Sequence, residues 1–142
     1  MSLTLYYHPL ASFCHKVLIA LYERGIAFEK RFIDLANEED REALGAVWPL
    51  LKFPVLRDAI RGRDIAETSI IIEYLDQHFD GAPPLIPSDP DEALQVRLWD
   101  RIFDHHVQVP MNEIVFDRLF GRNGDLSKWR SALDVVYDMR IP

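Results

Sequence analysis

The sequence contains a single cysteine among its 142 residues. One thiol excludes an intramolecular disulfide and a four-cysteine metal site, and with them the framework of a disulfide-rich secreted domain. No apolar run is long enough to span a bilayer, and no basic segment followed by an apolar one opens the chain as in a secretory signal. We therefore expect a soluble, cytoplasmic protein.

The chain also has few basic residues: 16 Lys and Arg against 23 Asp and Glu, for a formal net charge of -7. An acidic chain repels the phosphate backbone, so nucleic acid is not an expected partner. Apolar residues make up 49% and charged residues 27% of the chain, a balance that builds an ordinary core. The length suits one medium domain or two small ones.

The first 80 residues predict an α/β domain with the order βαβ followed by ββα. Residues 3–7 alternate like a strand, and a helix begins near Ser12, a residue type that often caps helices. The remaining elements are expected at 28–33 (strand), 37–46 (helix), 53–57 and 64–66 (strands) and 67–79 (helix). A strand–helix–strand unit of this length usually forms a parallel pair, so we expect a mixed sheet with helices on its faces.

Adjacent prolines at 83 and 84 mark the end of this first domain. They exclude helix and stiffen the chain, and they predict a linker over residues 81–88. Beyond it the pattern is all helical, from a helix that starts near Pro90 to a last helix over 126–139, with a break at Pro110. The buried side of the first of these helices is expected at Leu94, Leu98 and Ile102. The predicted parts are thus domains 1–80 and 89–142, joined by the linker.

Several segments resemble bacterial glutathione transferases, and the three in the first domain occur in the family's order and spacing. They are residues 6–17 (first strand, loop and helix), 51–56 (the family's glycine–lysine–valine–proline–valine–leucine) and 65–75 (the glutamate–serine helix start). Residues 98–104 resemble the first helix of the family's second domain. The resemblance extends from residue 3 to about 119. It implies a thioredoxin-like glutathione-binding domain, followed by an all-α domain that is shorter than the family's.

The resemblance also implies a set of glutathione-binding residues: Lys52, Phe53, Pro54, Val55, Glu67 and Thr68. Pro54 corresponds to the family's cis-proline, which presents the backbone of Val55 to the cysteinyl part of glutathione. Lys52 is expected to bind the glycine carboxylate. The start of the third helix, with Glu67 and Thr68, is expected to bind the γ-glutamyl end.

The catalytic group must stabilise a thiolate, since the thiolate is the nucleophile and a helix N-terminus favours it. Ser12 is our first candidate. Several family classes carry their catalytic serine or cysteine at the position of Ala11, so backbone N–H groups remain an alternative. Cys14 is a rival as a reactive thiol, unless it is a core cysteine. Tyr6 or Tyr7 could donate a phenol hydrogen bond to the thiolate, as in other family classes, but we expect both to be structural, with only one of them facing the core.

The second domain offers candidates for the electrophile pocket: Trp99, Asp104 and His105. Ligand sites favour domain interfaces, which is the reason for this choice. The alternative interpretation is a partly buried helix face. His105 and His106 diverge on a helix, so no metal site is expected. The predicted activity is a detoxifying transferase that attacks a small electrophile with glutathione as co-substrate, with no other cofactor, in a homodimer.

About sixty residues are left for the second domain, fewer than the family's helices require. Two other functions therefore stay open. One is a non-catalytic glutathione-binding or protein-interaction module that lacks the electrophile pocket. The other is glutathione-dependent thiol–disulfide exchange through Cys14.

Overall fold

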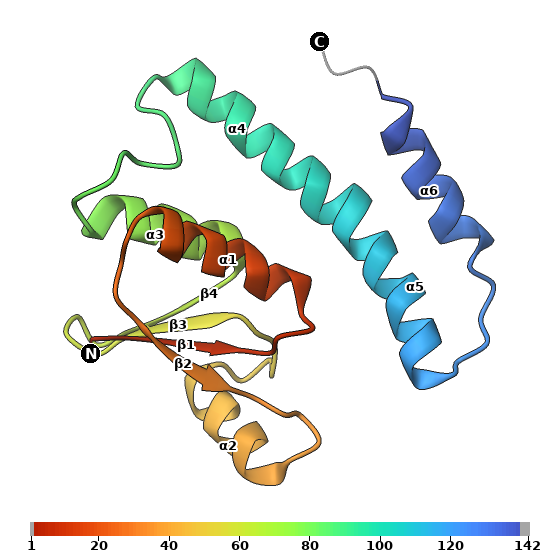
Figure 1. Ribbon diagram of the computed structural model, residues 1–142, viewed down its shortest axis with the longest axis horizontal. Helices are drawn as coiled ribbons and strands as arrows, with labels where there is room; N and C mark the ends of the chain where they lie inside the picture. Colours follow the sequence, from red (N-terminus) through yellow and green to blue (C-terminus); the bar gives the residue numbers. More distant parts are fainter. Residues whose placement is uncertain (1, 140–142) are drawn as a thin grey trace. The chain divides into compact units, whose positions relative to one another are not determined.

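The computed structural model describes residues 2–139, which form two compact units that divide between Ile86 and Pro87 (Figure 1). This division falls inside the predicted 81–88 segment. The first unit contains β1 (Leu3–Tyr7), α1 (Ser12–Glu23), β2 (Glu29–Phe32), α2 (Glu38–Val47), β3 (Val55–Asp58), β4 (Arg63–Ala66) and α3 (Thr68–His78). The second contains α4 (Pro90–Ile102), η1 (Phe103–Gln108), α5 (Val109–Phe120) and α6 (Ser127–Tyr137). The predicted order, βαβ–ββα and then helices, is confirmed.

The first unit is built on a four-stranded sheet with the order β2-β1-β3-β4. β1 and β2 run parallel, whereas β3 is antiparallel to both of its neighbours. The crossover through α1 explains the parallel pair, and the short turn after β3 explains the antiparallel one. In Figure 1, α1 and α3 lie on one side of the sheet and α2 lies on the other. The predicted mixed sheet with helices on both faces is therefore confirmed.

A separate core fills each face of the sheet. The larger one joins β1, β3 and β4 to α1 and α3 through Leu3, Leu5, Val17, Ala20, Leu21, Leu56, Ile65, Ile71, Tyr74 and Leu75. The smaller one joins Tyr6, Ile33, Leu44, Val47 and Val55 on the α2 side. Tyr6 is buried in the smaller core, and Tyr7 packs against the larger one. The expectation that only one of these tyrosines faces a core is wrong, because both faces of the sheet are covered.

Local capping differs among the helices of the chain. Asn37 caps α2, its Oδ1 accepting from the Asp40 N–H at 3.1 Å, and Asp89 caps α4. At α1, by contrast, the N-cap is Ala11, which makes no side-chain capping bond, and half-buried Ser12 is the first helical residue. The prediction that Ser12 caps this helix is wrong by one position. The predicted stop is confirmed, since Gly25 follows the C-cap with φ +61°, a conformation that glycine adopts readily.

The helical register of the second unit is interrupted where Pro110 was expected to break it. α4 continues into the π-helical segment η1, and α5 begins at Val109 with Pro110 in its first turn. Proline has no N–H and its ring clashes with the carbonyl four residues earlier, so a regular α-helix cannot run through this point. The wider π turns accommodate the proline. Gly121, with φ +58°, ends α5.

The buried stripe predicted on α4 does not form. The side chains of Leu94 and Leu98 are 63% and 49% exposed, and only Ile102 is half-buried. The last helix, α6, packs against η1 and α5, which follow α4 in the chain, and so it does not cover Leu94 and Leu98. No helix in the described residues is both long and apolar enough to cross a membrane.

Candidate functional site

The strand register brings three of the predicted binding segments to one end of the sheet. Val55, the first residue of β3, pairs with Tyr6 near the end of β1 and with Ala66 at the end of β4. The loop to α1 therefore leaves the sheet beside the point where the chain enters β3. The start of α3 follows β4 at the same end. The sequence predicted each of these segments separately, and the register of the sheet brings them close together.

The entry to β3 carries the predicted cis-proline. The Phe53–Pro54 peptide bond is cis, so this prediction is confirmed. Pro54 and Val55 are buried, with the Val55 side chain in the smaller core, and Phe53 is half-buried. Lys52 is exposed, so its ammonium can reach a ligand from solvent. Leu51, at the position of the family's glycine, has φ +52°, which is uncommon for a residue with a branched side chain.

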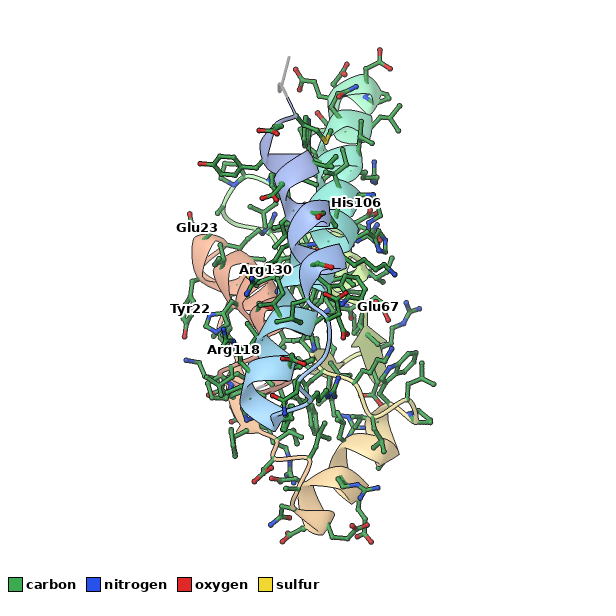
Figure 2. The ribbon with its side chains drawn as sticks, turned by 90° about the vertical axis from the view of Figure 1, so that its right-hand side faces the viewer. Tyr22, Glu23, Glu67, His106, Arg118 and Arg130 are labelled. Atoms are coloured by element: carbon green, nitrogen blue, oxygen red, sulfur yellow. The ribbon has the colours of Figure 1, made fainter. Side chains whose placement is uncertain are left out.

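The start of α3 contains a backbone outlier. Glu67 is the N-cap with φ +69° and ψ 123°, and its side chain makes no capping bond. Figure 2 shows this residue at the junction between β4 and α3. Its side chain is exposed, while the neighbouring Thr68 is 6% exposed. Strained residues of this kind cluster at binding sites, so the outlier supports a functional hypothesis for Glu67.

Cys14 does not have the environment of a reactive thiol. Its side chain is fully buried. Burial raises the pKa of the Cys14 thiol to about 11, against the smaller opposing effect of a hydrogen bond with the backbone of His8. A thiol with this pKa stays protonated at neutral pH and is a poor nucleophile. Burial as a core residue therefore disfavours the alternative of thiol–disulfide exchange through Cys14.

His8 belongs to this end of the sheet, although the sequence analysis did not select it. Its Nδ1 accepts from the Leu10 N–H at 3.1 Å, and its ring is stacked on Phe53 at 5.8 Å between centroids. A second contact, at 5.3 Å, joins the ring to Phe32 at the end of β2. A histidine directly before a proline at the end of a strand was the available signal. Its partners lie far along the chain, so the signal did not specify a role.

The second-unit candidates lie on α4 and η1. The Trp99 ring contacts the Phe103 ring at 6.0 Å, and Arg101 donates to the largely buried Asp104 carboxylate at 2.8 Å. His105 is exposed, as is His106, which Figure 2 labels. Among residues 2–139, no group of three or more His, Cys, Asp or Glu side chains is arranged to hold a metal. The electrophile pocket stays a prediction.

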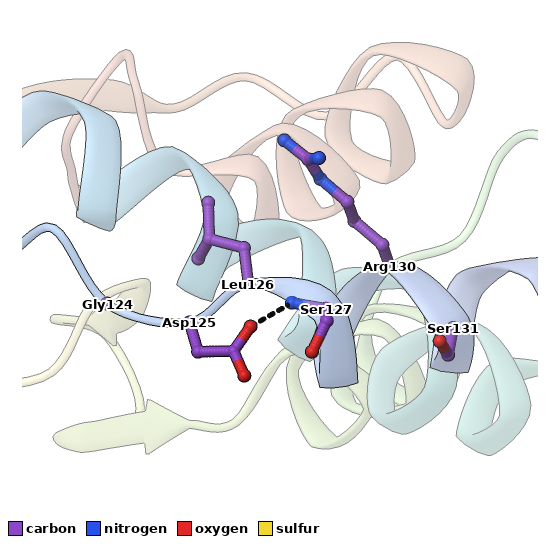
Figure 3. Close-up of a pocket in the computed structure, with 6 residues that line it drawn as sticks. All are labelled: Gly124, Asp125, Leu126, Ser127, Arg130 and Ser131. Atoms are coloured by element: carbon purple, nitrogen blue, oxygen red, sulfur yellow. Dashed lines mark hydrogen bonds between the residues drawn. The ribbon is translucent and has the colours of Figure 1, made fainter.

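A depression of about 520 Å³ lies at the start of α6 (Figure 3). None of the predicted site residues lines it; its walls are Gly124, Asp125, Leu126, Ser127, Arg130 and Ser131. The Asp125 carboxylate accepts from the Ser127 N–H at 2.9 Å, a bond that lowers the pKa of Asp125. This helix start already has a negative partner, so the depression is not a substitute for the site at the sheet end.

The fold and the site together define a thioredoxin-like α/β unit followed by a helical unit. The model of the glutathione S-transferase N-terminal domain matches residues 5–83. This match covers more than half of the chain, and the chain belongs to the glutathione S-transferase family.

Individual relatives agree with this assignment. Glutathione S-transferase U10 of Arabidopsis thaliana is 32% identical over 107 residues, which cover 75% of this chain and 44% of that protein. A glutathione S-transferase of Methylobacillus flagellatus, solved with glutathione bound, superposes with a TM-score of 0.78 at 25% identity, over 94% of this chain and 66% of that one. Rice GST1 in complex with glutathione gives a TM-score of 0.69 at 34% identity, over 79% and 51%. The chain spans about half the length of the curated relatives it matches.

Proposed function

We propose that this chain binds glutathione at the end of its sheet and stabilises the thiolate for attack on an electrophilic small molecule. The main support is the pairing of Val55 with Tyr6 on one side and Ala66 on the other. This register brings the loop to α1, the entry to β3 and the start of α3 to the same end of the sheet. The two family structures solved with glutathione support the choice of ligand.

Each end of the tripeptide has a matching group in the proposal. The N–H groups of the first turn of α3 receive the γ-glutamyl carboxylate, because a helix N-terminus carries partial positive charge. The exposed Glu67 carboxylate pairs with the γ-glutamyl ammonium, and the Thr68 hydroxyl adds a hydrogen bond. The exposed Lys52 ammonium pairs with the glycine carboxylate. The cysteinyl part lies along the entry to β3 at Val55.

The thiolate is stabilised at the start of α1 in this proposal. A free thiol with a pKa near 8.5 is mostly protonated at pH 7, so the site must favour its ionised form. The N-cap residue Ala11 has no polar side chain, so its side chain does not compete with a ligand for the N–H groups of the first turn. Ser12, the first residue of the helix, supplies a hydroxyl donor in the same turn. Preorganised donors of this kind favour the charged nucleophile.

Calorimetry on a variant of the γ-glutamyl site tests glutathione binding. Each charge-assisted hydrogen bond contributes roughly 1.5–3 kcal/mol. Glu67→Ala combined with Thr68→Ala is therefore expected to weaken glutathione binding by at least about tenfold. Glu42→Ala, at an exposed position of α2, is the matched loss of one carboxylate and should leave the affinity unchanged. Equal affinities of the double variant and the parent protein would remove this assignment.

Ser12→Ala separates binding from thiolate stabilisation. We expect it to keep glutathione affinity and to lose turnover of a generic electrophile, since in the proposal the Ser12 hydroxyl contacts the sulfur and neither end of the tripeptide. Unchanged turnover would assign the role to the backbone N–H groups of α1.

A non-catalytic glutathione-binding or interaction module is the second candidate. One observation favours it: Ala11 has no side-chain donor at the start of α1. Turnover of a generic electrophile at saturating glutathione distinguishes the two functions, because the module binds glutathione without consuming it. We further propose a homodimer, which would cover the exposed apolar side of α4, and a cytoplasmic location, where an unpaired thiol is common.

A further inference from the structure

We propose that His8 is a positioning residue that ties the start of α1 to the Phe53–Pro54 segment. This role rests on the proposed function, since these two segments would hold the sulfur and the cysteinyl backbone of glutathione. His8 acts through its neighbours and touches no reacting atom in the proposal. The proposal is based on the contacts of the His8 imidazole with three separate segments of the first unit.

The first contact determines the tautomer of His8. Its Nδ1 accepts from the Leu10 N–H at 3.1 Å. An amide N–H can only donate, so Nδ1 carries no proton and the neutral ring holds its proton on Nε2. The His8 carbonyl also accepts from the Ala11 N–H at 3.0 Å. One residue therefore holds both amides of the turn that leads into α1.

The second set of contacts connects this turn to the rest of the site. The His8 ring lies nearly parallel to the Phe53 ring, with an interplanar angle of 16° at 5.8 Å. It also contacts Phe32 at 5.3 Å and 38°. These distances are in the favourable range for aromatic pairs. The loop before α1, the end of β2 and the entry to β3 thus meet on a single ring.

His15, in the first turn of α1, provides a contrast. Its Nε2 lies 2.7 Å from the carbonyl oxygen of Pro9. A carbonyl can only accept, so this nitrogen carries a proton and is the donor. His8 is different, because a proton on its Nδ1 would abolish its contact with Leu10. His8 is therefore the member of the pair that holds the turn through a ring nitrogen acting as acceptor.

The N-cap of α1 explains why the turn depends on His8. Ser, Thr, Asp and Asn side chains often fix the first turn of a helix, but Ala11 cannot. The direction in which the chain enters α1 is then determined by the bonds to Leu10, Ala11 and Pro9. Ser12 and the first-turn amides follow from that direction. Loss of the His8 acceptor should displace them relative to Val55.

Two substitutions separate the acceptor from the ring. His8→Phe retains an aromatic ring to stack on Phe53 and removes the acceptor. His8→Asn removes the ring and supplies an oxygen that can bond the amide two residues on. His106→Phe makes the same exchange at an exposed imidazole on η1 and serves as the control.

The first measurement uses the free protein and needs no glutathione. Nitrogen NMR of the imidazoles should show His8 with its proton on Nε2, and Leu10 amide exchange should accelerate roughly fivefold in His8→Phe. His8→Asn should restore slow exchange, and His106→Phe should not change it. A proton on Nδ1, or unchanged Leu10 exchange in His8→Phe, overturns the proposal.

The second measurement follows the bound thiol by its ultraviolet thiolate absorbance. The thiolate fraction of bound glutathione should fall by roughly fivefold in His8→Phe and recover in His8→Asn, whereas His106→Phe matches the parent protein. An unchanged thiolate fraction in His8→Phe overturns the link to the sulfur site. If the parent protein does not bind glutathione, the proposed function fails, and the NMR result alone decides whether His8 positions the turn.

Discussion

Nη1 of Arg24 lies 2.6 Å from Oδ1 of Asp76, and the side chains of the two residues are only 3% and 9% exposed. The same carboxylate accepts from the Leu85 N–H at 3.1 Å and from the Ile86 N–H at 2.9 Å. Arg24 also donates to the carbonyl of Phe79. A buried ion pair therefore joins the C-cap of α1, α3 and the chain just before the second unit begins. It holds the end of the first unit against its own helices.

Asp76→Asn should strongly destabilise the first unit. The substitution leaves the Arg24 guanidinium buried without a counter-charge, and its Nε already has no hydrogen-bond partner. Breaking a buried pair on one side costs about 3–5 kcal/mol. Urea unfolding should show a lower midpoint at a similar slope. Arg41→Gln, which breaks an exposed pair with Glu38 at 3.6 Å, should cost at most about 0.5–1 kcal/mol. Equal midpoints for Asp76→Asn and Arg41→Gln would contradict the structural importance of this pair.

Asp58 and Tyr74 make stability depend on pH at both extremes. Burial of the Asp58 carboxylate alone would raise its pKa, but hydrogen bonds from Arg61, Tyr74 and the Ile60 N–H outweigh burial and leave the pKa lowered. Its stabilising contribution is therefore complete above about pH 4, the ordinary carboxyl pKa, and is lost as pH falls through the lower native value. Burial and the bond to Asp58 raise the pKa of Tyr74 above 10.0. The contribution of Tyr74 is lost as pH rises through that higher native value.

Tyr74→Phe tests this coupling through the 2.8 Å bond between the Tyr74 hydroxyl and Asp58. Removing one hydrogen bond to a charged group should cost about 1.5–3 kcal/mol at neutral pH. Plots of stability against pH should become shallower below pH 4 and lose the decline above pH 10. Tyr137→Phe, at a side chain that is 92% exposed, should leave the profile unchanged. A parallel downward shift with no change of slope at either end would show that the two groups do not titrate together.

Gly45→Ala should stabilise the protein. A Cβ added at Gly45 meets the Leu51 Cδ2 at 3.4 Å, an ordinary van der Waals distance, and alanine favours the helix over glycine by about 0.8–1 kcal/mol. Gly62→Ala is the matched opposite: a Cβ meets nothing there, but φ is +61°. An alanine in that conformation should cost about 1–2 kcal/mol. Thermal unfolding of both variants shows whether each substitution raises or lowers stability. A loss of stability in Gly45→Ala would show that the Leu51 side chain cannot move away from the added methyl group.

The exposed apolar side of α4 should drive self-association. Leu94 and Leu98 are 63% and 49% exposed, and apolar patches of this kind usually mark interfaces. Sedimentation at micromolar concentration is expected to show a dimer or larger assembly. Leu94→Glu with Leu98→Glu should shift it to monomer, because like charges would then face each other. Gln95→Glu adds charge at another exposed position of the same helix and should have a smaller effect. A stable, well-behaved monomer of the parent protein would refute the prediction.

Local chemistry in the sequence was enough to predict the order of elements. Alternation in residues 3–7, Gly25 after the first helix, and Pro110 in the second unit each act on neighbouring backbone, so their effects can be read without a partner. The same reasoning failed for Ser12 by one position. Ala11, not Ser12, takes the extended conformation of the N-cap. The turn that precedes it contacts Phe32 and Phe53 through the His8 ring, and these residues lie far along the chain.

Burial and juxtaposition were decided by the tertiary structure. Periodicity shows which residues share a side of an element, but only the covering element decides whether that side is buried. Cys14 and Tyr6 are buried and Tyr7 is partly buried because helices cover both faces of the sheet. Leu94 and Leu98 on α4 are exposed because α6 packs against α5 and η1. The sequence by itself determined where the backbone turns and stops, through local sterics and missing or added hydrogen-bond donors. Contacts such as His8 with Phe53 required the folded sheet, because they join residues that only its register brings together.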